Sequence, residues 1–450
     1  MILRILESQW SPFVESLCGR QDVETAGVIL AERLHGGTLL ARHCLAIPED
    51  GYQIRQVDRL RIDPVAFNRL VRLARDRGLS VITIHTHPGT DRPWFSSADD
   101  QGDSRLMPSL FAQMAGPHGS VVVAGETRIP TARVWSGSGA VDEVTVRVVG
   151  RVLRTHAPGA STDGNSSCFD RQLLALGAAG QATLRTLHVA IVGLGGTGSV
   201  ALAQLAHLGI GKLTVIDGDR VDSSNVSRVF GSTRADAGKT WKVDVAQRYV
   251  RELGLATRVI ALRGHLGPEI APTHFEDADV VLSCVDKHTP RALLNRMAYE
   301  KGIPLIDVGS AFRLDDHGRI ASGAGRVVVV GPGRPCLACW GHIDPDRLRI
   351  ESLSPTDRAT AVAEGYISGA DVPQPSVVAF NTAVAGAAVI ELLRITTAFA
   401  GADDPPLRLA FDFASGTVRR NSLAAGRACS ICTPMFGAGG TVDPAAGDAP

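Results

Sequence analysis

Short apolar runs alternate with segments of helical periodicity along most of this chain, a pattern typical of an α/β fold. Residues 25–31 and 81–84 are predicted to be buried strands. Residues 64–75 between them are predicted to form a helix, because their apolar side chains share one face, at Phe67, Leu70, Val71 and Ala74. We therefore expect an N-terminal sheet that packs against helices.

A second strand–helix–strand pattern lies in the middle of the chain. Residues 188–192 have the composition of a buried strand, an apolar helical pattern follows to about Leu208, and residues 212–216 form the next strand. Residues 280–286 predict another buried strand, and residues 289–301 a helix. This order predicts a parallel, doubly wound sheet.

The most apolar run, residues 377–393, is predicted to be a core helix rather than a membrane span, because it contains Asn381, Thr382 and Glu391.

The formal net charge is zero, which argues against broad binding to nucleic acid or an anionic membrane. The N-terminal residues lack the long apolar core of a signal peptide. Two CxxC pairs among eight cysteines suit metal binding in a reducing cytoplasm, where we expect this protein.

Glycines occupy the turn between the predicted strand 188–192 and the helix after it. Gly193 allows a tight turn, Gly195 and Gly196 let phosphates approach the backbone, and Gly198 lets the helix pack on the strand. The free N–H groups at the helix start can hold anionic oxygens. At the end of the next strand, acidic side chains can accept from ribose hydroxyls, at Asp217 and Asp219. This pattern alone would usually indicate a dehydrogenase.

Two cations close to this turn argue for a different chemistry. Arg228 and Lys242 follow the second strand. A dinucleotide needs neither of them, whereas a triphosphate that loses pyrophosphate needs cations to stabilise the developing charge. The sequence therefore favours an enzyme that cleaves ATP between the α- and β-phosphates.

These residues resemble the ThiF/MoeB-type adenylating enzymes, the family that includes ubiquitin-activating enzymes. The shared pattern is GxGxxG, then D-x-D-x-V-x-x-S-N-x-x-R, then a lysine that opens a helix, and the resemblance runs from about Phe169 to Cys432. It implies a Rossmann-like doubly wound adenylation domain that binds ATP and Mg²⁺. The implied nucleotide-binding residues are Gly193, Gly195, Gly196, Gly198, Asp217, Asp219, Asn225, Arg228, Lys242 and Asp286.

The resemblance also implies roles for residues outside the glycine turn. Arg171 would reach the phosphates from the partner subunit of a homodimer, where a guanidinium stays charged and donates in a planar fork; a surface arginine at a helix start is the alternative. Asp286 ends a buried strand, so it would face the triphosphate and hold Mg²⁺. The family usually has Asn after this aspartate, and here Lys287 replaces it.

A second group of polar residues lies in the N-terminal part. His85 and His87 alternate on an extended chain, so both can reach one ion, and Asp99 would add a third ligand from the start of the next helix. Two histidines, one carboxylate and one open position fit a catalytic zinc that carries water. Glu24 is the candidate to move the proton, and Ser96 can donate to the oxyanion of a tetrahedral intermediate.

This set resembles the JAMM (JAB/MPN) metalloproteases, over residues 1 to about 135. Their pattern is an upstream Glu, HxHP, a short spacer and SxxD, and they hydrolyse bonds after the C-terminal glycine of ubiquitin-like proteins. The spacer here is one residue longer and includes Pro93 and Trp94, so Ser97 and Asp100 are alternatives to Ser96 and Asp99. Two surface-loop histidines, or an inactive relative with the same fold, are the other interpretations.

Two CxxC pairs, Cys336 with Cys339 and Cys429 with Cys432, predict a closed tetrahedral zinc site that is structural. A disulfide or redox role is the alternative. Residues 340–375 between the pairs are polar and predicted to be irregular. No cysteine occurs from 340 to 428, so the free candidates for a thioester are Cys18, Cys44, Cys168 and Cys284.

The sequence predicts the following domain organisation: residues 1–140 a JAB/MPN α/β metalloprotease-like domain, 141–167 a linker that contains one strand at 144–152, 168–436 the adenylation domain, and 437–450 a disordered tail.

The predicted function is ATP-dependent adenylation of the C-terminal glycine of a ubiquitin-like or sulfur-carrier protein, with zinc-dependent cleavage of the same tail. The simplest scheme stops at the acyl-adenylate and passes it to an acceptor, either a conjugating enzyme or a sulfurtransferase. The alternative function is adenylation of a small molecule or a tRNA base, with the JAMM-like part as a docking domain without turnover.

Overall fold

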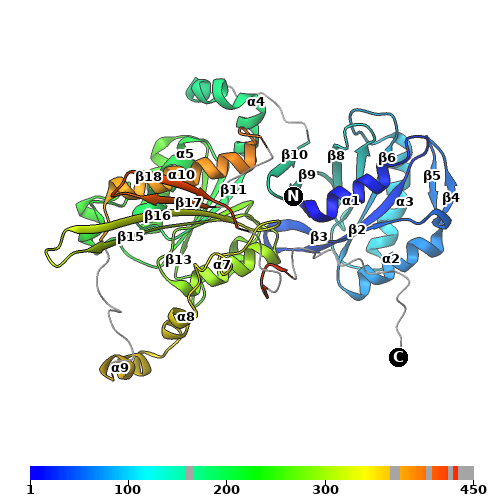
Figure 1. Cartoon of the computed structure of the whole chain (residues 1–450). Helices are drawn as coiled ribbons and strands as arrows, with labels where there is room; N and C mark the ends of the chain where they lie inside the picture. Colours follow the sequence, from blue (N-terminus) through cyan, green and yellow to red (C-terminus); the bar gives the residue numbers. More distant parts are fainter. Residues whose placement is uncertain (159–166, 365–374, 402–407, 424–428, 434–450) are drawn as a thin grey trace. The chain divides into compact units, whose positions relative to one another are not determined.

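The computed structural model describes residues 1–158, 167–364, 375–401, 408–423 and 429–433. The chain forms two compact units that divide near residue 160. Figure 1 labels the helices and strands of both units and colours them along the sequence. The predicted tail, 437–450, lies outside the described residues.

The first unit is one eight-stranded sheet with helices on both faces. The strand order is β1-β3-β2-β6-β7-β8-β9-β10, and β1 also pairs with β9. Its strands are β1 (Ile2–Leu6), β2 (Ala26–Arg33), β3 (Thr38–Ala46), β6 (Ser80–His87), β7 (His118–Ala124), β8 (Pro130–Trp135), β9 (Val141–Val149) and β10 (Leu153–His156). Its helices are α1 (Glu7–Cys18), α2 (Pro64–Asp76) and α3 (Ser97–Phe111), and β4 (Tyr52–Arg55) and β5 (Leu60–Ile62) form a separate hairpin.

Side chains of β2 alternate between two apolar cores, as expected for a strand that is covered on both faces. Ile29 packs with Trp10 and Phe13 of α1 in one core. Leu30 packs with Val71 of α2 in the other. The predicted helix 64–75 is thus confirmed as α2. Asp63 caps it by accepting from the backbone N–H of Val65 at 2.8 Å.

The predicted linker 141–167 is wrong for most of its length. The strand expected at 144–152 is β9, which pairs with β1 and β8, and β10 pairs with β9. Val146 and Val148 are fully buried in the first core. The Gly- and Ser-rich residues around 138 therefore form a turn within the sheet, not a domain boundary.

The second unit contains the predicted doubly wound sheet, in the order β13-β12-β11-β14-β15-β16-β17-β18. The first five strands are parallel and the last three antiparallel. Its strands are β11 (His188–Val192), β12 (Lys212–Asp217), β13 (Arg258–Arg263), β14 (Val280–Ser283), β15 (Leu305–Leu314), β16 (Ile320–Val330), β17 (Arg408–Asp412) and β18 (Thr417–Asn421). Its helices are α4 (Asp170–Thr186), α5 (Gly196–His207), α6 (Lys242–Leu253), α7 (His288–Glu300), α8 (Pro345–Glu351), α9 (Pro355–Ala363) and α10 (Val378–Thr397).

Strand order changes direction at β11 and β14, which makes this point the topological switch of the sheet. From β11 the chain passes through α5 to β12 and through α6 to β13, on one side of β11 in the sheet. From β14 it passes through α7 to β15, on the other side. Right-handed crossovers therefore put α7 on the opposite face from α5 and α6. The carboxyl ends of β11 and β14 meet at one edge, where a ligand of such a sheet binds.

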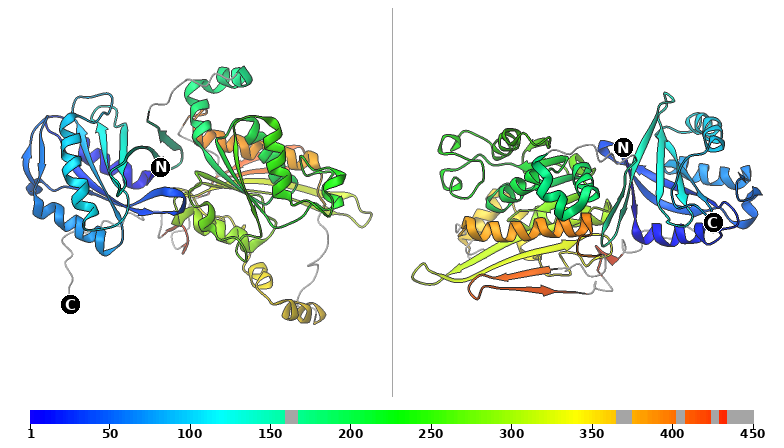
Figure 2. Two further views of the ribbon diagram at one scale, coloured as in Figure 1. Left: turned by 180° about the vertical axis from the view of Figure 1, so that it is seen from behind. Right: turned by 90° about the horizontal axis from the view of Figure 1, so that it is seen from above.

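The apolar run expected to be a core helix is α10, which packs against α5, β15 and β16 (Figure 2). Among the described residues, α10 alone is long and apolar enough to cross a membrane. Of its most apolar stretch, 44% is buried inside the fold. Asn381 and Glu391 are almost completely buried within it. The polar region expected to be irregular instead contains α8 and α9, and its residues 365–374 lie outside the described part.

Candidate functional site

The turn between β11 and α5 closes by direct contact between backbones. Gly193 has φ +90°, and a Cβ added there would lie 2.6 Å from the carbonyl oxygen of Cys284. A Cβ on Gly198 would lie 1.9 Å from the oxygen of Gly193. Any side chain at either position would therefore force the turn apart. This geometry matches the tight turn and the close helix packing that the sequence predicts for these glycines.

Two side chains approach the same turn from outside. A Cβ added to Gly196 would lie 2.2 Å from Nδ2 of Asn381 and 3.5 Å from Cδ of Arg228. Asn381 belongs to α10, is 1% exposed and donates to Oγ of Ser376 at 3.0 Å. The sequence predicted a core helix that contains Asn381 but indicated no role for this side chain. An amide inside so apolar a helix was the signal that it contacts something specific.

The two acidic residues after β12 have different environments. Asp217 is buried, and its carboxylate accepts from the backbone N–H groups of Leu194 at 2.7 Å and Asp219 at 2.8 Å. Asp217 therefore braces the glycine turn. The side chain of Asp219 is 54% exposed. Binding of ribose by either residue stays a prediction, and Asp219 has the more accessible oxygens.

Lys242 opens α6 and brings its ammonium group to this edge of the sheet. Its Nζ lies 2.6 Å from Oδ2 of Asp219 and 3.8 Å from Oδ1 of Asp217. Arg228 is partly buried and donates from Nη1 to the carbonyl oxygen of Ser224 at 2.7 Å. The structure thus brings both predicted cations and both acids to the phosphate-binding end of the sheet, where the cations can face an anionic ligand.

The other predicted nucleotide-binding residues differ in burial: one is buried and supports the local backbone, and two are exposed. Asn225 is buried, and its Oδ1 accepts from the backbone N–H of Asp222 at 3.2 Å, so it holds the loop after β12 in shape. Asp286 is exposed and precedes Lys287, the N-cap of α7, so it does not cap that helix itself. Arg171 is exposed in the first turn of α4. Their contacts with nucleotide remain predictions.

A buried ion network beneath Asp286 was not anticipated from the sequence. Asp307 is fully buried and accepts from Oγ of Ser283 at 2.8 Å and Nε of Arg291 at 3.0 Å. Arg291 also donates to the carbonyl oxygen of Val285 at 2.8 Å, one residue before Asp286. The network therefore fixes the backbone at the carboxyl end of β14. Its partners are distant in sequence, so no local motif reveals them.

In the first unit, β6 carries two imidazoles to the end of the sheet. His85 and His87 have their Nε2 atoms 3.2 Å apart, and Nε2 of His85 lies 3.0 Å from Oδ1 of Asp99. Nε2 of His87 lies 3.5 Å from Oδ2 of Asp99. Ligands at about 2.0–2.2 Å from one zinc ion are separated by such distances. The three residues therefore form a cluster that fits one metal ion.

The structure resolves which acid joins the two histidines. Ser96 is the N-cap of α3, and it forms a capping box with Asp99, whose N–H donates to Oγ of Ser96 at 3.2 Å. Oγ of Ser96 donates to Oδ2 of Asp99 at 2.8 Å, so this hydroxyl orients the acid. Asp100 instead pairs with Arg133. The oxyanion role of Ser96 stays a prediction.

Glu24 lies just outside the metal cluster, beside the start of β2. Its Oε1 is 4.0 Å from Nε2 of His87, beyond the distance of a shared inner ligand, and its side chain is 13% exposed. Burial raises the pKa of Glu24, and the nearby imidazoles of His85 and His87 oppose this shift. A largely buried carboxylate at this distance can accept a proton from a water molecule next to the ion.

Replacing Asp99 by asparagine should remove zinc from the first unit, whereas Asp100→Asn should not. Loss of the charged ligand should weaken zinc affinity by more than about 100-fold. Asp100→Asn is the matched control, because it removes the same charge one residue away, from the pair with Arg133. Metal analysis after dialysis against a weak chelator checks both variants. Retention of both zinc equivalents by Asp99→Asn would contradict this ligand set.

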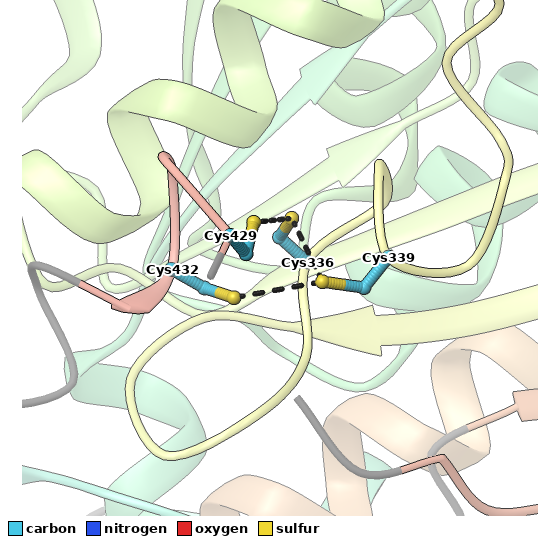
Figure 3. Close-up of side chains that lie close together, drawn as sticks. All are labelled: Cys336, Cys339, Cys429 and Cys432. Atoms are coloured by element: carbon cyan, nitrogen blue, oxygen red, sulfur yellow. Dashed lines mark hydrogen bonds between the residues drawn. The ribbon is translucent and has the colours of Figure 1, made fainter. Parts of the chain in front are cut away.

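The four cysteines of the two CxxC pairs converge in the second unit (Figure 3). Sγ of Cys336 lies 3.8 Å from Cys339 and 3.6 Å from Cys429, and Sγ of Cys339 lies 3.7 Å from Cys432. Four thiolates at about 2.3 Å from a tetrahedral zinc are about 3.8 Å apart. The geometry therefore fits a closed zinc site that joins segments 93 residues apart.

Buried hydrogen bonds hold the first of these pairs in place. Oδ1 of Asn295 accepts from the backbone N–H of Leu337 at 2.9 Å, and the hydroxyl of Tyr299 donates to the carbonyl oxygen of Arg334 at 2.8 Å. Both supporting residues belong to α7. The cysteine cluster is thus tied to the helix that follows β14.

Substitution of Cys432 by alanine should remove the second zinc equivalent and destabilise the second unit. Loss of a link between distant segments should cost several kcal/mol, or about 10 °C in the midpoint of thermal unfolding. Cys168→Ala is the control, because Cys168 is exposed and outside the cluster. Metal analysis and differential scanning calorimetry give the two readouts. A stable Cys432→Ala protein with full zinc content would refute the site.

Both units match known families. Residues 169–431 match the ThiF family, and residues 6–136 match the prokaryotic homologs of the JAB domain. Among curated proteins, the adenylyltransferase and sulfurtransferase uba4 of Aspergillus niger is 32% identical over 270 residues, 59% of this chain and 52% of that protein. The protein of the same name from Aspergillus terreus is 33% identical over 269 residues, 59% of this chain and 51% of that protein.

This chain therefore spans about half the length of the curated relatives that it matches. Among solved structures, E. coli MccB with MccA-N7isoASN is 17% identical and has a TM-score of 0.48, over 61% of this chain and 77% of that one. The ThiF match covers more than half of the sequence and includes the glycine turn, both cations and three of the four clustered cysteines. The chain belongs to the ThiF family and carries a JAB-type domain in its N-terminal part.

Proposed function

We propose that the ThiF segment adenylates the C-terminal glycine of a ubiquitin-like or sulfur-carrier protein with ATP. The observation that carries this proposal is the meeting of the glycine turn with Lys242 and Arg228 at the carboxyl edge of the parallel sheet. The names of the curated relatives, adenylyltransferase and sulfurtransferase, support the same chemistry. A tail with a free carboxylate is the substrate that needs no further activation by a base.

In the proposed reaction, a carboxylate oxygen of the tail attacks the α-phosphorus of ATP, and the bond to pyrophosphate breaks. Lys242 and Arg228 stabilise the negative charge that develops on the phosphates, together with Arg171 of a partner subunit. Asp286 would hold Mg²⁺, which neutralises phosphate oxygens when bound. The nucleophile is already ionised, so the site needs no proton acceptor.

A homodimer would supply Arg171 in this scheme, and two features of the second unit support one. An apolar hollow of about 550 Å³ lies between α5 and α10, lined among others by Val200, Val389 and Ile390. Leu174, in the same helix as Arg171, is 81% exposed. A second copy that covers both features would bury this apolar surface. Sedimentation of the full chain tests the dimer.

We further propose that the first unit is a zinc-dependent (iso)peptidase that cleaves after the same C-terminal glycine. His85, His87 and Asp99 would hold the zinc, which would lower the pKa of a water molecule and polarise the scissile carbonyl. Glu24 takes a proton from the attacking water and gives it to the leaving amine. Two activities directed at one tail give a reason for their presence in one cytoplasmic chain.

The adenylate is proposed to pass directly to an acceptor protein, either a conjugating enzyme or a sulfurtransferase. Burial raises the pKa of Cys44 and of Cys284 to about 12, so neither thiol is a ready nucleophile. Burial also raises the pKa of Cys18. Cys168 is exposed, and Cys168→Ala should leave transfer intact if no thioester forms on this chain.

ATP–pyrophosphate exchange tests the adenylation, with purified small β-grasp proteins encoded near this gene as substrates. In a Glu24→Gln protein, which should not trim the tail, exchange should require a carrier whose last residue is glycine and should disappear when that carrier is extended by one residue. No exchange with any such carrier would count against the proposal. Exchange with a small molecule or a tRNA alone would favour the alternative substrates instead.

A further inference from the structure

Trp94 is a large aromatic side chain that stays half exposed beside the predicted zinc ligands. Its ring lies edge-on to His87, with ring centroids 5.0 Å apart. The side chain is 51% exposed, although the imidazole that it touches is buried. Packing of the core does not account for an indole in this position, because half of its surface faces solvent.

The segment around Trp94 is fixed on its C-terminal side by a stacked arginine. The guanidinium of Arg133 lies 3.8 Å from the ring centroid of Phe95 and 4.7 Å from that of Trp135. Nη2 of Arg133 also donates to Oδ2 of Asp103 at 2.7 Å. The residue next to Trp94 is therefore anchored to the sheet and to α3.

Hydrogen bonds fix the N-terminal side of the same loop. Oγ1 of Thr90 donates to the carbonyl oxygen of His87 at 2.7 Å, and the backbone N–H of Glu126 donates to the carbonyl oxygen of Thr90 at 3.0 Å. Oγ1 of Thr127 donates to the carbonyl oxygen of Asp91 at 2.7 Å. With both flanks held, the indole keeps its place over His87 without burial of its own.

We propose that Trp94 is a specificity-determining residue of the proposed peptidase. Its indole forms one wall of the metal site and contacts a substrate segment that has no side chains. A peptide whose scissile carbonyl reaches the ion must pass close to His87, and so across the indole. Glycine leaves room there and lets the flat peptide group lie on the ring, whereas a β-carbon would meet the ring. The occupant is an extended, glycine-ended tail of a small protein. This inference rests on the proposed peptidase function of the first unit.

The test compares the full-length wild type with Trp94→Ala and Trp94→Phe on two internally quenched peptides. One peptide has Gly-Gly before the scissile bond and the other Gly-Ala. The wild type should prefer Gly-Gly, and Trp94→Ala should reduce this preference by about 10-fold while zinc content stays unchanged. Trp94→Phe should keep most of it. Val65→Ala is the control, because Val65 is 61% exposed on α2 and away from the cluster.

Binding to a zinc-loaded Glu24→Gln protein separates this inference from turnover. Calorimetry with the Gly-Gly peptide should show about 10-fold weaker binding when Trp94→Ala is added. Cleavage by the wild type with an unchanged Gly/Ala preference in Trp94→Ala would overturn the role of Trp94 and leave the peptidase standing. A wild type that neither cleaves nor binds the Gly-Gly peptide would overturn both.

Discussion

Replacing Lys242 by alanine is expected to slow carrier-dependent ATP–pyrophosphate exchange by about 10²- to 10³-fold, a loss of about 3–4 kcal/mol in transition-state stabilisation. Lys242 is the buried cation of the phosphate-binding edge, 2.6 Å from Asp219. Without it, Asp217 and Asp219 would face the triphosphate with uncompensated charge. Initial exchange rates at saturating carrier and varied ATP measure the effect.

The matched control is Lys239→Ala, three residues away. Lys239 is exposed, so its substitution removes the same charge without removing a contact with either acid. Its exchange rate should stay within about twofold of the wild type. If Lys242→Ala folds with a normal unfolding midpoint and exchanges at the wild-type rate, then Lys242 does not act on the phosphates and the proposed site is wrong.

The sequence predicted the strand 188–192 to the residue, since an unbroken apolar run that ends at Gly193 leaves little freedom in its assignment. The helix 64–75 was equally well marked by its amphipathic spacing, and the structure adds Asp63 as its N-cap. The glycine turn and the two cysteine pairs were also found correctly, because each depends on residue types at fixed short spacing. A short sequence pattern is enough to predict a feature when the residues that form it are close together in the sequence.

The errors concern features that depend on distant partners or on short helices. Strand 144–152 was expected but assigned to a linker, because its pairing with β1 joins residues far apart in sequence. The helices α8 and α9 were missed, although Asp344-Pro345 and Ser354-Pro355 are N-cap signals. A low content of apolar residues hid these two helices.

The choice between Asp99 and Asp100 shows why a motif alone left the proposed zinc ligands ambiguous. Successive residues of a helix point about 100° apart, so one inserted residue in the spacer changes which acid faces the histidines. The capping box between Ser96 and Asp99 sets the start of α3. Arg133, which lies in β8 outside the motif, forms an ion pair with Asp100. Tertiary contacts therefore decide the ligand.

Substitution of Glu24 by glutamine should lower cleavage of a carrier extended beyond its terminal glycine by about 10²- to 10⁴-fold, with zinc content unchanged. The amide keeps the shape of the side chain but cannot accept the proton of the attacking water. At 4.0 Å from His87, Glu24 lies outside the ligand set, so the ion should remain bound. Single-turnover cleavage and metal analysis of the same samples give both values.

Glu126→Gln is the isosteric control, since Glu126 is exposed in the same unit and its side chain is not part of the metal cluster. The two outcomes that contradict this account have different meanings. Loss of zinc together with activity in Glu24→Gln would make Glu24 a ligand rather than a proton acceptor. Full cleavage with full zinc content would mean that another group moves the proton, because a water molecule at neutral pH still has to lose one before it can attack.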